Sequence, residues 1–150
     1  MIALLASFAV LQAASVASHG VYCSLFELDG SGQVPAGSKV LPLSFLMSGH
    51  MDDPNGRTIL RVFDPSGLLN GTKFDSVFFD QSIGGGTYAV TAPVSSTSAG
   101  YLLMMKPRES RGEFDATFGG RDQTRRKIYR GRCFGPVGPM DEAAFDAENK

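Results

Sequence analysis

Two histidines, His19 and His50, are the first side chains to consider for chemistry in this chain of 150 residues. His19 follows an uncharged apolar leader, and a cut after Ser18 would make it the first residue of the mature chain. The amine and the ring of an N-terminal histidine can chelate copper together, and a second imidazole suits the same metal. His19 and His50 are therefore a candidate metal site.

The start His19-Gly20 resembles that of secreted copper monooxygenases and copper carriers with β-sandwich folds. The resemblance implies a copper-binding protein or a copper-dependent oxidase that uses an N-terminal histidine brace, with His50 as the second ligand. A cut after Ala17 would instead leave Ser18 as the first residue, and we expect His19 to lie at the frayed start of the mature chain. This copper hypothesis is the alternative to a non-catalytic role.

Other catalytic patterns are missing from the sequence. It contains no G-x-S-x-G, no H-E-x-x-H and no C-x-x-C, which are the spacings of a nucleophile elbow and of common zinc sites. Our first hypothesis is therefore a non-catalytic protein without a cofactor. It would bind a small molecule or a protein, such as a hydrolase that it inhibits.

Positive charge gathers in the last third of the chain. Residues 106–132 hold nine basic and four acidic side chains, although the whole chain has a net charge of −1. An exported chain with this net charge is a poor partner for nucleic acid, so we interpret the basic strip as a contact surface for another anion. Its predicted members are Arg121, Arg125, Arg126, Lys127, Arg130 and Arg132.

The N-terminal leader predicts export. Residues 2–17 carry no charge, are too few for a membrane span of about 20 residues, and fit the apolar region of a secretory signal. Cleavage after Ala17 or after Ser18 would give a secreted or periplasmic protein without a membrane span, which we expect to be a monomer. The predicted organisation is a signal peptide at 1–18, one all-β domain at 19–135, and a polar tail at 136–150 that is disordered or forms a short helix.

The two cysteines, Cys23 and Cys133, are expected to form a disulfide in an oxidising compartment. A disulfide requires Cα atoms within about 7 Å of each other. Because Cys23 lies in the first predicted strand and Cys133 at the end of the last, those two strands must be neighbours.

About eight short segments have the alternating or apolar pattern of strands, and Gly, Asn, Asp and Pro separate them. Short connections favour antiparallel neighbours. Together with the joined ends, they predict an all-β fold, a closed up-and-down barrel of about eight antiparallel strands, with a two-sheet β-sandwich as the alternative. The segments are 21–28, 40–47, 58–64, 73–79, 86–92, 100–106, 113–119 and 126–133.

Overall fold

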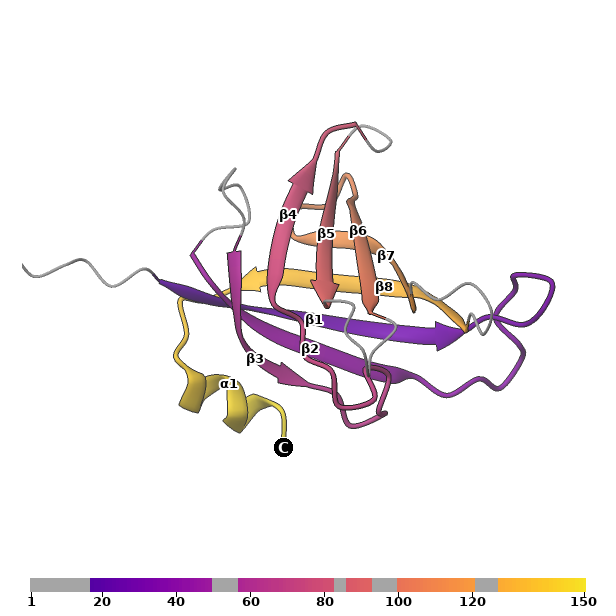
Figure 1. Cartoon of the computed structure of the whole chain (residues 1–150), viewed down its shortest axis with the longest axis horizontal. Coiled ribbons are helices and arrows are strands. Elements are labelled where there is room, and N and C mark those ends of the chain that lie inside the picture. Colours follow the sequence, from indigo (N-terminus) through magenta and orange to yellow (C-terminus); the bar gives the residue numbers. More distant parts are fainter. Residues whose placement is uncertain (1–16, 50–56, 83–85, 93–99, 121–126) are drawn as a thin grey trace, which may run out of the picture.

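The computed structural model describes residues 17–49, 57–82, 86–92, 100–120 and 127–150. These residues form a closed antiparallel barrel in which each strand pairs with the next and the last pairs with the first (Figure 1). The predicted up-and-down barrel is confirmed, and the sandwich alternative is not the fold. The elements are β1 (Ser18–Glu27), β2 (Leu41–Ser48), β3 (Arg57–Phe63), β4 (Ser76–Asp80), β5 (Thr87–Ala92), β6 (Tyr101–Pro107), β7 (Glu113–Gly120), β8 (Ile128–Val137) and α1 (Glu142–Glu148).

Alternation of side chains builds the wall of the barrel. In β7, Phe114, Ala116 and Phe118 are buried, whereas Asp115 between them is exposed. Successive side chains of a strand point to opposite faces, so this pattern separates an inner from an outer surface. Each strand therefore carries an outer row of side chains that the core does not use.

The barrel closes where β1 meets β8. Cys23 and Cys133 are directly paired in the register of these strands and are joined by a disulfide, with Cα atoms 4.0 Å apart. The predicted disulfide is therefore present in the structure. The β3–β4 seam is shorter, with two paired positions between Arg57–Thr58 and Ser76–Val77.

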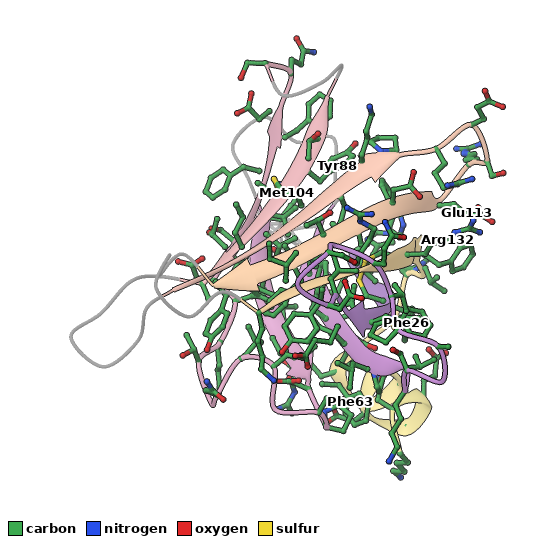
Figure 2. The ribbon with its side chains drawn as sticks, turned by 90° about the vertical axis from the view of Figure 1, so that its right-hand side faces the viewer. Phe26, Phe63, Tyr88, Met104, Glu113 and Arg132 are labelled. Atoms are coloured by element: carbon green, nitrogen blue, oxygen red, sulfur yellow. A yellow bond between two sulfur atoms is a disulfide. The ribbon has the colours of Figure 1, made fainter. Side chains whose placement is uncertain are left out.

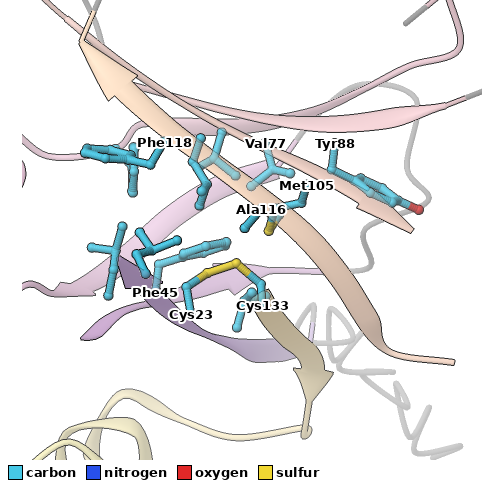
Figure 3. Close-up of a cluster of buried hydrophobic side chains, with 14 of the residues drawn as sticks. Cys23, Phe45, Val77, Tyr88, Met105, Ala116, Phe118 and Cys133 are labelled. Atoms are coloured by element: carbon cyan, nitrogen blue, oxygen red, sulfur yellow. A yellow bond between two sulfur atoms is a disulfide. The ribbon is translucent and has the colours of Figure 1, made fainter. Parts of the chain in front are cut away.

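Side chains fill the interior of the barrel (Figure 3). Phe45, Leu103 and Met105 are fully buried there, and the loop between β3 and β4 adds Leu69 and Phe74 to the same cluster. The carboxylate of Asp64 holds this loop by accepting hydrogen bonds from backbone N–H groups of residues 68 and 69, at 3.0 and 2.8 Å. The interior is thus a packed core that leaves the outer wall as the surface for function.

The C-terminal tail ends in a helix that lies against the barrel. Asp141 caps α1 by accepting a hydrogen bond from the N–H of Ala144 at 2.8 Å, which satisfies a free donor of the first turn. Phe145 of α1 is 1% exposed and lies beside Tyr22 of β1, while Arg61 of β3 forms an ion pair with Glu142. Of the two states predicted for the tail, the helix is observed.

Strand β8 continues through Pro136 to Val137, beyond the predicted end of this segment at residue 133. The register between β1 and β8 shifts between Gly20 and Tyr22, beside this proline. A proline lacks the N–H that a regular hydrogen-bond ladder needs. Within a sheet, prolines are therefore found where the register is irregular, as it is here.

Candidate functional site

A groove of about 610 Å³ runs over the outer wall where β7, β8 and β1 lie side by side. The loop between β1 and β2 forms one edge through Val34, which is 44% exposed. We call this feature the outer groove. Its lining residues are Ser24, Phe26, Val34, Asp115, Ala116, Thr117, Arg130, Gly131 and Arg132.

Two rows of paired residues cross the three strands in the outer groove. Arg132 lies between Ser24 and Asp115 in one row. In the next outward row, Arg130 lies between Phe26 and Thr117. Figure 2 shows Phe26 and Arg132 on the same side of the barrel. The groove therefore combines two guanidinium groups with an aromatic and an aliphatic wall.

The loop that carries Val34 is held by one carboxylate. Asp29 accepts hydrogen bonds from the N–H and the hydroxyl of Ser31, at 2.9 and 2.6 Å, and from the N–H of Gln33 at 3.0 Å. The Ser31 hydroxyl and these backbone donors lower the pKa of Asp29 below its ordinary value of 3.8. These hydrogen bonds within the loop fix the edge of the outer groove.

The charges beside the outer groove form ion pairs, whereas its two arginines form none with the residues that the structure describes. Lys127 lies 3.0 Å from a carboxylate oxygen of Glu27, and this hydrogen-bonded contact raises the pKa of Lys127. Asp115 is bound by Arg108 at 2.6 Å. Within the part of the chain that the structure describes, neither Arg130 nor Arg132 has an ion-pair partner.

The predicted basic strip is divided by the structure. Arg130 and Arg132 line the outer groove, and Lys127 lies before β8 in its pair with Glu27. The other three predicted members, Arg121, Arg125 and Arg126, lie outside the described residues.

Sequence reasoning missed the apolar and polar side chains beside the arginines. The signal for them was the disulfide, because pairing Cys23 with Cys133 fixes the register of β1 against β8. In that register Ser24 must lie opposite Arg132, and Phe26 opposite Arg130. No disulfide determines the position of the loop residue Val34 in this way.

A second, smaller hollow adjoins the outer groove and shares Thr117 with it. This adjoining hollow has a volume of about 230 Å³ and lies over β6, β7 and β8. Gly119 provides its floor between Leu102 and Ile128, which are its neighbours in the register. The lining residues are Leu102, Met104, Thr117, Phe118, Gly119, Gly120 and Ile128.

The candidate copper ligand His19 lies within β1 instead of at a frayed start. Its side chain is 6% exposed, and its Nδ1 atom lies 2.9 Å from the carbonyl oxygen of Gly49. His50 is outside the described residues. Among the residues that are described, no cluster of three or more His, Cys, Asp or Glu side chains could hold a metal ion.

The chain was compared with protein-family models, with curated proteins and with solved structures, and none of them matches it. No helix in the described ranges has the length and apolar character to cross a membrane.

Proposed function

We propose that this is an exported, non-catalytic binding protein that contacts a partner protein through the outer groove and the adjoining hollow. The observation that carries the proposal is the pair Arg130 and Arg132, which lie without ion-pair partners among the described residues, in a groove with apolar walls. Arginine and aromatic side chains are enriched in the cores of protein interfaces.

A protein partner fits this geometry better than an enclosed small molecule does. Ligand pockets usually surround most of a small ligand, but here the packed core occupies the interior and the groove lies on the outer wall. Exposed apolar side chains continue along the wall, with Val34 44% and Ile128 39% exposed. A partner that covers both would remove this apolar surface from water.

Export is supported by two independent features of the chain. The Cys23–Cys133 disulfide is typical of oxidising compartments. The uncharged stretch at 2–17, of which residues 2–16 lie outside the described residues, has the character of a secretory signal. Both support a secreted or periplasmic location.

Site-specific photocrosslinking tests the proposed surface. A photoreactive amino acid at Thr117, which is shared by the two hollows, should give a defined adduct with an exported protein of the source cells. The same amino acid at Lys73, an exposed position outside both hollows, should not. Adducts at neither position, or equal adducts at both, would overturn the proposal.

One observation supports copper binding as a second candidate function. His19 lies beside Gly49, the residue that precedes His50 in the sequence, and copper would replace the Gly49 carbonyl at the Nδ1 atom of His19. N-terminal sequencing of the exported protein, followed by copper titration with electron paramagnetic resonance, tests this candidate. Copper binding requires a mature chain that begins at His19 and a copper signal that His50→Ala abolishes. A mature chain that begins at Ser18 or Gly20 would refute this candidate.

A further inference from the structure

We propose that the groove recognises an extended acidic segment of the partner, with the pattern acidic–x–acidic–x–apolar, lying along β8. This inference rests on the proposed function and specifies the chemistry of the partner. It follows from the order of three outward side chains on β8, namely Arg132, Arg130 and Ile128.

The spacing of the arginines selects the acidic pair. Arg130 and Arg132 are two residues apart on one strand, which places them about 6.5 Å apart along it. Alternate side chains of an extended peptide repeat at the same spacing. Two carboxylates at positions i and i+2 can therefore face two guanidinium groups at once, and arginine suits carboxylates because its planar donors can bind both oxygens.

Among the described residues that line the groove, Arg130 and Arg132 are the cations available to a ligand. Glu27 is bound to Lys127, and Asp115 is bound to Arg108. Arg108 thus neutralises Asp115, the acidic residue of the groove. Asp115 therefore repels an incoming carboxylate less strongly than an unpaired aspartate would.

The adjoining hollow selects the apolar residue of the pattern. One further step of two residues along β8 leads from Arg130 to Ile128, and there the wall becomes apolar through Leu102 and Met104. Gly119 leaves room for a side chain from the partner. Among the described residues other than its chain neighbours, a Cβ atom added there would have one atom within 4 Å, the carbonyl oxygen of Lys127, at 3.5 Å. A purely anionic polymer, such as a sulfated polysaccharide, would leave this hollow without a matching group.

Fluorescence anisotropy with a labelled peptide tests the inference. The probe is an uncharged Ser-Gly peptide with one central Glu-Ser-Glu-Ser-Leu sequence, measured at low ionic strength. We expect saturable binding that weakens with added salt. Replacing either Glu by Gln, or introducing Arg130→Gln or Arg132→Gln, should weaken binding about tenfold. Lys73→Gln removes one positive charge outside both hollows and should leave binding unchanged.

The variant Gly119→Val tests the apolar position separately, because it fills the adjoining hollow. It should weaken binding of the Leu peptide but not of a peptide with Ser in place of Leu. Circular dichroism and thermal unfolding confirm that each variant is folded before its affinity is measured.

The outcomes separate the two proposals. If Thr117 crosslinks a partner but the acidic peptide does not bind, the acidic chemistry is wrong and the proposed surface stands. If a sulfated polysaccharide binds through Arg130 and Arg132 and the peptide does not, the inference is likewise overturned. If Arg132→Gln and Lys73→Gln reduce binding of the peptide equally, the attraction depends only on net charge. That result would also refute the inference.

Discussion

Cys23 of β1 and Cys133 of β8 face each other across the seam that closes the barrel, 110 residues apart in the sequence. A disulfide between the first and last strands ties the ends of the sheet together and limits the freedom of the unfolded chain. Loop-closure entropy puts the stabilisation for such a loop at about 4–5 kcal/mol.

Loss of this disulfide should therefore lower stability strongly. We expect the double variant Cys23→Ala, Cys133→Ala to unfold at a much lower urea concentration than the oxidised protein, by several kcal/mol in free energy. The reduced natural chain is the control for the missing sulfur atoms, and its urea midpoint should lie close to that of the double variant. Equal midpoints for the oxidised and reduced protein would show that the disulfide does not stabilise the barrel.

Gly131 should be required for the closure between β1 and β8. A Cβ atom at this position would lie 1.9 Å from the carbonyl oxygen of Ser24 and 2.9 Å from the Cα atom of Leu25, so the backbones would have to separate. We expect Gly131→Ala to cost about 3 kcal/mol or more in unfolding free energy. Gly119→Ala is the matched control and should change stability by less than about 1 kcal/mol. Similar urea midpoints for the two variants would contradict the tight approach.

The helix α1 should stabilise the protein by packing against the wall, chiefly through its aromatic side chain. Leu46 is fully buried although it lies outside the interior cluster, and it pairs in the register with Arg61, which contacts α1. We expect Phe145→Ala to cost about 3–5 kcal/mol. Arg61→Gln breaks half-exposed ion pairs with Glu142 and Asp146 and should cost less than about 1 kcal/mol. Thermal unfolding compares the two, and equal losses would contradict the role of Phe145.

The loop that forms the edge of the outer groove should open in acid. The pKa of Asp29 is lowered in the folded protein, so its carboxylate stabilises the loop fully above the ordinary value of 3.8. That contribution is lost as the pH falls through the lowered pKa. As the pH falls through this range, the rate of hydrogen exchange at the amides of Ser31 and Gln33 should therefore rise relative to the rate in unstructured peptides.

The variant Asp29→Ala should remove this acid transition and loosen the loop at neutral pH as well. Asp80→Ala is a suitable control, because Asp80 holds a similar turn through Ser82 on a different loop. If the protection of the Ser31 and Gln33 amides does not change with pH, Asp29 does not hold this loop. The same conclusion follows if Asp80→Ala changes that protection as much as Asp29→Ala does.

Much of the fold could be predicted because its signals are local. Alternation of side chains with a period of two marks a strand wherever it lies, as in Phe114, Ala116 and Phe118 of β7. The end of β8 was predicted too early, since the acceptance of Pro136 depends on the irregular register of its neighbour β1. The two cysteines identify β1 as the neighbour of β8, but the sequence pattern of β8 contains no information about the shift in register beside Pro136.

The sequence by itself determined the strands, the disulfide and, through it, the closure of the barrel, because two cysteines in the first and last strands can form a disulfide only when those strands are neighbours. Only the tertiary structure decided which arginines line a groove, that the interior is filled, and that Phe145 is buried. The reason is physical: a groove forms from side chains on three strands and a loop, and their meeting depends on the register and the folding of loops. Such long-range contacts leave no periodic mark on the individual segments.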